Sequence, residues 1–133
     1  MSHNSPLWNK SEMLEDVANL LHDKGYYLAV AHAAYYSCFQ VMKCIWLYSM
    51  GKSEDTLASN TSQATMGSHE YLLNEVVNYI NSKKGDTRYL RNNIPQLKKL
   101  RRQADYDDTT IDYVTSKRVI DLSQELLIIL RKY

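Results

Sequence analysis

The residues best suited to chemistry lie in the segment LRRQADYD, residues 100–107, where a predicted helix ends and a loop begins. A guanidinium from Arg101 or Arg102 can hold a phosphate group through two parallel hydrogen bonds. A neighbouring carboxylate or phenol, from Asp105 or Tyr106, can orient that guanidinium. The same residues also suit a structural role, because a basic side chain in the last turn of a helix complements the helix dipole. In that interpretation Asp105 pairs with Arg101 or Arg102 and fixes the helix end.

Positive charge is concentrated in the same part of the chain. The whole chain has a formal net charge of only +1, yet residues 87–104 contain no acidic residue and six basic ones: Arg88, Arg91, Lys98, Lys99, Arg101 and Arg102. Any affinity for nucleic acid must therefore come from this local group. The alternative is an ordinary solvated helix face, above all for Lys98 and Lys99.

His69 is predicted near the start of a helix that begins at Ser68. There an imidazole and free backbone N–H groups can together contact an anion. A capping or packing role is the alternative. The histidines and the cysteines Cys38 and Cys44 show no spacing typical of a zinc site, and no glycine-rich phosphate loop is present. We therefore predict no metal site and no cofactor.

Length and composition indicate one soluble domain. A chain of 133 residues can bury about two thirds of its unfolded surface without a disulfide or a metal. Cys38 and Cys44 lie six residues apart on one predicted helix, so their side chains point in different directions and cannot bond. There is no signal peptide and no run of the roughly 18 to 20 apolar residues that crosses a membrane. We expect a cytoplasmic protein.

Apolar spacing predicts an all-α fold, an antiparallel up-and-down bundle of four to five helices in a single domain over residues 1–133. The central helix is expected over 26–51, because its apolar side chains cover more than half of its circumference and need neighbours on several sides. The other helices are expected over 6–22, 68–82 and 87–104, and from a cap at Thr115 or Ser116 onward. Pro95 should kink or break the helix that contains it.

Two segments lack sustained helical periodicity. Residues 1–5 are expected to be a disordered start, whose last residue, Ser5, can cap a helix with Pro6 at its first position. Residues 52–67 are rich in Ser, Thr and Asn and are expected to form a long surface loop, either mobile or part of a site. The tight turn at Gly25 should place the first helix antiparallel to the central one.

A polar face remains on the central helix, and it is expected to meet either solvent or a second subunit. The apolar arc is wider than the covering helices readily bury, and 11 tyrosines suit a partly polar interface, so we predict a homodimer. The candidate interface residues are His32, Tyr35, Tyr36, Gln40 and Lys43.

Three segments together resemble the HEPN family of small α-helical domains: HAAYYSCFQVMKC (32–44), GSHEYLLNEV (67–76) and LRRQADYDD (100–108). They occur in the family's order and at about its spacing. The most specific feature is the combination of Tyr35, Tyr36 and Phe39 with the Arg-x-x-Ala-Asp-Tyr pattern that starts at Arg101. The resemblance implies an antiparallel helical bundle that commonly dimerises. It also implies a place beside a minimal nucleotidyltransferase, or in a toxin–antitoxin or phage-defence system.

Many members of that family are metal-independent ribonucleases that use an Arg followed, after four to six residues, by a His. This chain departs from the pattern, because the matching positions after Arg101 hold Tyr106, Asp107 and Asp108. A phenol with a pKa of about 10 is a poor general base near neutral pH, whereas an imidazole with a pKa of about 6.5 is well suited. The family's frequent Arg before Ala-Tyr-Tyr is Ala33 here.

We therefore predict a HEPN-like domain that dimerises and binds RNA, a nucleotide or a partner protein such as a nucleotidyltransferase, without efficient catalysis. The candidate ligand-binding residues are His69, Arg101, Arg102, Asp105 and Tyr106. One alternative is a metal-independent endoribonuclease toxin in which Arg101 and Tyr106 act with an imidazole from His69 or His32. The other alternative is a structural adaptor whose tyrosines form a partner interface.

Overall fold

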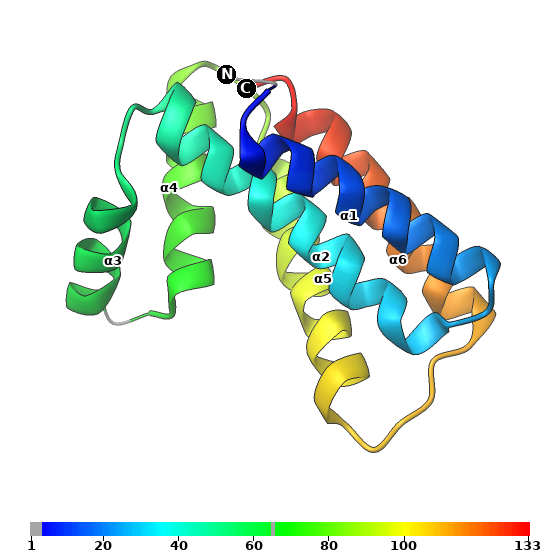
Figure 1. The fold of residues 1–133 in the computed structure, drawn as a ribbon. Helices are drawn as coiled ribbons and strands as arrows, with labels where there is room; N and C mark the ends of the chain where they lie inside the picture. Colours follow the sequence, from blue (N-terminus) through cyan, green and yellow to red (C-terminus); the bar gives the residue numbers. More distant parts are fainter. Residues whose placement is uncertain (1–3, 65) are drawn as a thin grey trace.

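The structure is a computed structural model that describes residues 4–64 and 66–133, and these residues form an all-α fold, as predicted. Among them there is no strand, and six α-helices follow one another: α1 (Pro6–Asp23), α2 (Tyr27–Cys44), α3 (Glu54–Gln63), α4 (Ser68–Ser82), α5 (Arg88–Tyr106) and α6 (Tyr113–Leu130). Helices α1, α2, α5 and α6 form a bundle, and α3 and α4 lie to one side of it (Figure 1).

The first two helices form the expected antiparallel pair. Ser5 caps α1, because its hydroxyl accepts a hydrogen bond from the backbone N–H of Trp8 at 3.1 Å. Gly25 turns the chain with a φ of +80°, which is costly for a residue that has a Cβ. Ser5 is buried and its hydroxyl lies 3.4 Å from the sulfur of Cys44, so the expected disorder does not extend to this residue. Residues 1–3 of the expected disordered start lie outside the described residues.

Helix α2 is the centre of the bundle, as its wide apolar arc predicts. It contacts α1, α4, α5 and α6. Its buried residues are Val30, Ala31, Ala33, Ala34, Tyr35, Ser37, Cys38, Val41, Met42 and Cys44. Each large apolar side chain removed from water contributes roughly 1.5–3 kcal/mol, so this helix supplies a large share of the hydrophobic stabilisation. Cys38 and Cys44 form no disulfide.

Beyond Cys44 the central helix widens into a π-helical turn, η1 (Ile45–Ser49), in which the N–H of Met50 donates to the carbonyl of Ile45 at 2.8 Å. Gly51 ends the helical stretch with a φ of +67°. Trp46, within the π-helical turn, is fully buried, and its Nε1–H donates to the carbonyl of Ser53 at 2.8 Å. This bond attaches the start of α3 to the end of the central helix.

The predicted surface loop over residues 52–67 is wrong in its middle part, which is helix α3. Ser53 caps this helix by accepting from the N–H of Thr56 at 3.0 Å, and the carboxylate of Glu54 stands in the first turn. No residue of α3 is buried, so it has no apolar face that periodicity could reveal. An ion pair of 2.8 Å between Glu54 and Lys43 connects α3 to α2.

A kink or a break was predicted at Pro95, and because helix α5 continues through this residue, a break does not occur. Proline removes one backbone donor from a helix, but the buried side chains of Leu90, Ile94, Leu97 and Leu100 hold both halves of α5 against the core. The final helix, α6, starts earlier than predicted. Its cap is Asp112, whose carboxylate accepts from the N–H of Thr115 at 2.8 Å.

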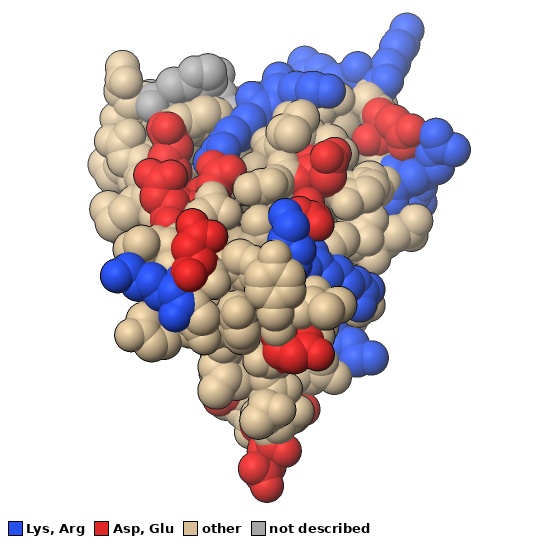
Figure 2. Space-filling model, turned by 90° about the vertical axis from the view of Figure 1, so that its right-hand side faces the viewer, with Lys and Arg blue, Asp and Glu red and all other residues tan. Residues whose placement is uncertain are grey.

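One face of the molecule carries both positive and negative side chains. On the side of the bundle away from α3 and α4, acidic and basic side chains occur in small separate groups (Figure 2). Within the described part of the chain, no helix has the length and apolar character needed to cross a membrane.

Candidate functional site

Arg101 is a charged side chain buried near the end of α5, where it is 7% exposed. Its guanidinium lies 5.3 Å from the ring centre of Tyr35 and 5.5 Å from that of Tyr36. The Nε atom has no hydrogen-bond partner among the described residues. A buried donor without a partner costs roughly 1–3 kcal/mol. Arg101 is therefore an expensive residue for folding alone, and its side chain also lines a pocket.

Asp105 connects Arg101 with His32. Its Oδ2 accepts a hydrogen bond from Nδ1 of His32 at 2.9 Å and lies 3.5 Å from Nη1 of Arg101, one turn earlier on α5. The pairing of Asp105 with Arg101 was predicted from the sequence and is confirmed. The contact with His32 was not predicted, and it directs this histidine toward α5 of the same chain.

His69, the second residue of α4, lies among aromatic side chains of α2. Its Nδ1 is 2.8 Å from the phenolic oxygen of Tyr35, and its ring centre is 4.4 Å from that of Phe39. Partial burial lowers the pKa of His69, and the positive charges of Lys98 and Arg101 lower it further. His69 is therefore neutral near pH 7. Burial also raises the pKa of Tyr35, so its phenol keeps its proton.

Two adjoining pockets open between the start of α4 and helix α5. The larger, which we call the α4–α5 groove, has a volume of about 840 Å³. Its lining comprises Tyr35, His69, Glu70, Leu73, Asn74, Arg91, Ile94, Pro95, Lys98, Lys99, Arg102, Gln103, Tyr106 and Asp107. The smaller, which we call the α4 hollow, has a volume of about 520 Å³. Its lining comprises Gly67, Ser68, His69, Lys98, Arg101, Arg102 and Tyr106.

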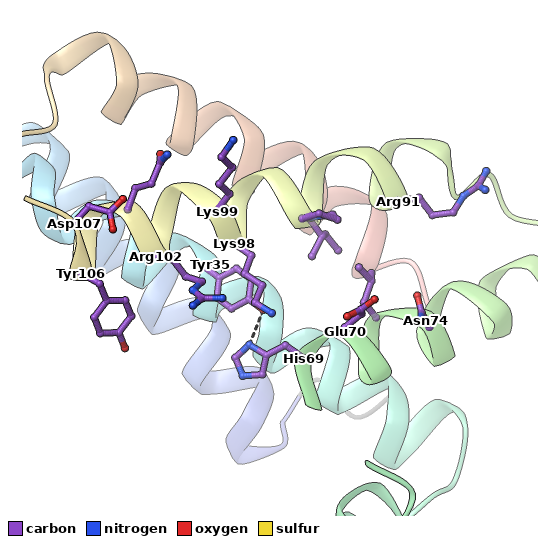
Figure 3. A pocket seen from close by; sticks show the side chains of 14 residues that line it. Tyr35, His69, Glu70, Asn74, Arg91, Lys98, Lys99, Arg102, Tyr106 and Asp107 are labelled. Carbon is purple, nitrogen blue, oxygen red and sulfur yellow. Dashed lines mark hydrogen bonds between the residues drawn. The ribbon is translucent and has the colours of Figure 1, made fainter. Parts of the chain in front are cut away.

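The α4 hollow has an unbalanced charge, since Lys98, Arg101 and Arg102 line it and no carboxylate does. Figure 3 shows Lys98 and Arg102 reaching from α5 toward His69, with Tyr106 at the edge of the site. The structure thus brings four of the five predicted ligand-binding residues together at this hollow. The fifth, Asp105, lines neither pocket and is instead paired with Arg101 and His32.

The first turn of α4 adds backbone donors to the hollow. Gly67 is the N-cap and offers no side-chain acceptor to this turn. Among the described residues, nothing accepts a hydrogen bond from the N–H groups of Ser68 and His69. Free N–H groups and the positive end of the helix dipole both favour an anion.

The predicted interface residues are largely covered within the chain. Tyr35 is 1% exposed, so it cannot line a dimer interface in this structure, because α4 and α5 already cover it. Lys43 pairs with Glu54 of α3. Tyr36 is half-buried, and its ring lies 4.8 Å from that of His32. Gln40 is also half-buried, and its Oε1 has no partner in the described part of the chain. On the polar face of α2, Tyr36, Gln40 and Lys43 are therefore half-buried within the chain, whereas the side chain of His32 is 55% exposed.

Two parts of the site were not predicted from the sequence. Lys98 was not assigned to the same pocket as Arg102, although a spacing of four residues places both on one helix face. Tyr35 was not paired with His69. The basic residues Arg91, Lys98 and Arg102, spaced by seven and four, carry the signal that could have identified the groove wall.

No group of three or more His, Cys, Asp or Glu side chains in the described ranges is placed to hold a metal ion. Comparisons of the chain with models of protein families, with curated proteins and with solved structures gave no match.

Proposed function

We propose that this chain is an RNA-binding, HEPN-like domain that holds RNA phosphates at the α4 hollow and along α5, without efficient cleavage. One observation carries the proposal: Arg101, which is 7% exposed and whose Nε has no partner among the described residues, lines a hollow whose lining contains three basic side chains and no carboxylate. Asp105 offsets part of this charge by pairing with Arg101 from outside the lining, and a phosphodiester supplies further acceptor oxygens and negative charge.

The basic side chains of the α4–α5 groove extend over a distance that favours RNA over a single small anion. Arg91 and Arg102 both line this groove and are eleven positions apart on α5. At roughly 1.5 Å per residue this distance is about 16 Å, which exceeds the spacing of neighbouring phosphates in a nucleic acid strand. Lys98 and Lys99 lie between them. Glu70 and Asp107 also line the groove and reduce its positive charge, whereas no carboxylate lines the hollow and Asp105 opposes its Arg101 from outside the lining.

Weak cleavage follows from the residue that stands where a catalytic imidazole would be expected. Tyr106 is 73% exposed and lines the hollow, and a phenol is a poor general base compared with an imidazole. A positioned general base contributes roughly 10² to 10⁴ in rate. A site with Arg101 but without such a base can bind a phosphodiester and polarise it, yet cleaves it slowly.

The cellular location, the oligomeric state and the biological system belong to the same proposal, and they rest on the resemblance to the HEPN family. We place the protein in the cytoplasm, as a homodimer, in a toxin–antitoxin or defence-type system, with a nucleotidyltransferase as the candidate partner protein. Light scattering at tens of micromolar tests the dimer, and a monomer mass would refute it.

Fluorescence anisotropy with a labelled single-stranded RNA tests the binding proposal. We expect affinity to fall steeply as salt rises, because each neutralised phosphate releases counterions. Replacing Arg102 by Gln should reduce both the affinity and the salt slope. Replacing Arg88 by Gln is the matched control, since Arg88 pairs with Asp86 and lines neither pocket. Absence of binding, or binding that ignores salt, would refute the proposal.

A metal-independent endoribonuclease is the second candidate, and the position of His69 favours it. Its imidazole is neutral near pH 7 and lines the same hollow as Arg101, so a proton acceptor and a phosphate ligand share one pocket. Labelled RNA incubated with the protein in chelator separates the candidates. Rapid cleavage that disappears in both His69→Asn and Arg101→Met would establish the enzyme.

A further inference from the structure

We infer that the two pockets form one site for a single unpaired nucleotide: the α4 hollow takes its phosphate on the first N–H groups of α4, and the α4–α5 groove takes its base. The inference rests on the proposed function and adds the form of RNA that is recognised. The site accepts single strands and rejects duplex.

The phosphate position is indicated by two independent features of the hollow. Helix α4 is 15 residues long and begins at this point with N–H groups at Ser68 and His69 that have no acceptor within residues 4–64 and 66–133. The buried guanidinium of Arg101, reaching the same hollow from α5, has a donor without a partner among the described residues. Backbone donors on one side and a guanidinium on the other can satisfy different oxygens of one phosphate.

The base position follows from the lining of the groove. Its apolar wall consists of Leu73, Ile94 and Pro95, which suit the faces of a nucleobase. A volume of about 840 Å³ falls in the range of pockets that hold small organic ligands. Tyr106 is 73% exposed at the edge and offers a ring on which a base can stack. Four residues belong to both pockets, so the phosphate and its own base can occupy them together.

The preference for single strands follows from the position of the base. A base that enters a pocket between two helices cannot remain paired and stacked in a duplex, and extracting it costs a few kcal/mol. A site that used phosphates alone would bind both forms, because both carry the same backbone charge.

The test uses the full chain and fluorescence anisotropy with a short labelled RNA, either single-stranded or annealed to its complement. Ser68→Pro removes one N–H of the proposed phosphate site. It should leave the fold intact, because proline suits the first position of a helix and Gly67 already has the extended ψ of 165° that a following proline requires. Glu54→Pro is the control, a proline at the first position of α3, since Ser53 before it also has an extended ψ of 162° and Glu54 lines neither pocket. Tyr106→Ala removes the stacking ring, and Tyr26→Ala is its control, an exposed tyrosine that lines neither pocket.

We expect single-stranded RNA to bind at least about tenfold more tightly than duplex, and Ser68→Pro and Tyr106→Ala each to weaken single-strand binding by about tenfold. The two controls should remain within about twofold of the parent protein. Equal affinity for duplex, or unchanged binding in Ser68→Pro and Tyr106→Ala, would overturn this inference alone if Arg102→Gln still weakens binding. A parent protein that binds neither form would overturn the proposed function as well.

Discussion

The phenolic oxygen of Tyr35 lies 2.8 Å from Nδ1 of His69, and this hydrogen bond joins the central helix to the first turn of α4. The two residues are 34 positions apart in the chain, and their rings are nearly parallel, with centres 5.6 Å apart. Because Tyr35 is buried, it fixes the position of an imidazole that lines both pockets. The contact therefore connects the core of the bundle to the candidate site.

The lowered pKa of His69 predicts a loss of stability in acid. The folded protein holds this imidazole neutral, so between its folded pKa and the usual value of 6.5 the unfolded chain binds more protons. The stability that the protein gains from a neutral His69 is complete above about pH 6.5, and it is lost as the pH falls through 6.5 toward the folded pKa. We expect the free energy of unfolding to decrease on going from about pH 7.5 to about pH 5.5. Urea denaturation at each pH measures it.

His69→Asn provides the comparison, since its side-chain oxygen can still accept from the Tyr35 hydroxyl and does not titrate. The difference in stability between the parent protein and His69→Asn should change with pH in this window, whichever way the remaining histidines contribute. A difference that is constant with pH would show that His69 is not held neutral.

Replacement of Arg101 separates its cost in folding from its role in binding. Arg101→Met keeps much of the volume but removes one partner of the ion pair with Asp105, whose carboxylate is 21% exposed and keeps its hydrogen bond with His32, so little uncompensated charge is left buried. We expect its free energy of unfolding to remain within about 1 kcal/mol of the parent protein. Arg101→Ala leaves a cavity beside Tyr35 and should lose about 2–4 kcal/mol.

Both Arg101 variants should bind single-stranded RNA at least about tenfold more weakly, because a buried charged hydrogen bond is worth more than a surface one. Anisotropy on protein whose folding has been verified by circular dichroism measures the effect. Full affinity in Arg101→Met would assign Arg101 to a structural role.

Local sequence signals predicted much of the fold. The caps and turns at Ser5, Gly25 and Gly51 lie where the residue types indicate, because each acts within a few residues of itself. Helix α3 was missed because it has a capped start but no buried face. The π-helical turn after Cys44 was also missed, since an apolar pattern read with a period of 3.6 does not report an inserted residue.

In the site, too, contacts between neighbouring residues could be predicted from the sequence, whereas contacts between distant residues could not. Arg101 and Asp105 are four residues apart on one helix, so their pairing could be predicted from spacing. The contacts between His32 and Asp105, 73 residues apart, and between Tyr35 and His69 depend on how three helices cross. Helical periodicity identifies which face of a helix is buried. It does not determine which residue of the neighbouring helix that face meets.

Gly85 should resist substitution because it packs against the C-terminal residue. A Cβ at this position would lie 2.6 Å from Cγ2 of Ile80 and would collide with the phenol group of Tyr133. Tyr133 is itself held by a hydrogen bond of 2.6 Å from Ser49 to its backbone oxygen. We expect Gly85→Ala to lower the free energy of unfolding by about 1–3 kcal/mol, measured by urea denaturation.

Gly67→Ser is the control for this substitution, since nothing lies within 4 Å of a Cβ at Gly67 and serine is a good N-cap. Its stability should equal or exceed that of the parent protein. If Gly85→Ala proves as stable as Gly67→Ser, then Tyr133 does not hold this packed position in solution.

Introducing histidine at position 106 tests whether the site lacks only a proton acceptor. Tyr106 lines both pockets beside Arg102, five residues after Arg101, and is 73% exposed, so Tyr106→His should fold normally. A general base placed beside a phosphodiester contributes roughly 10² to 10⁴ in rate. We expect the parent protein to cleave labelled RNA slowly or not at all in chelator, and Tyr106→His to cleave it at least about tenfold faster.

Tyr113→His is the control, because Tyr113 is exposed and lines neither pocket, and this variant should cleave no faster than the parent protein. Adding Arg101→Met to Tyr106→His should abolish the gain in cleavage rate. Rapid cleavage by the parent protein, unchanged in Tyr106→His and lost in His69→Asn, would instead show that His69 already supplies the base.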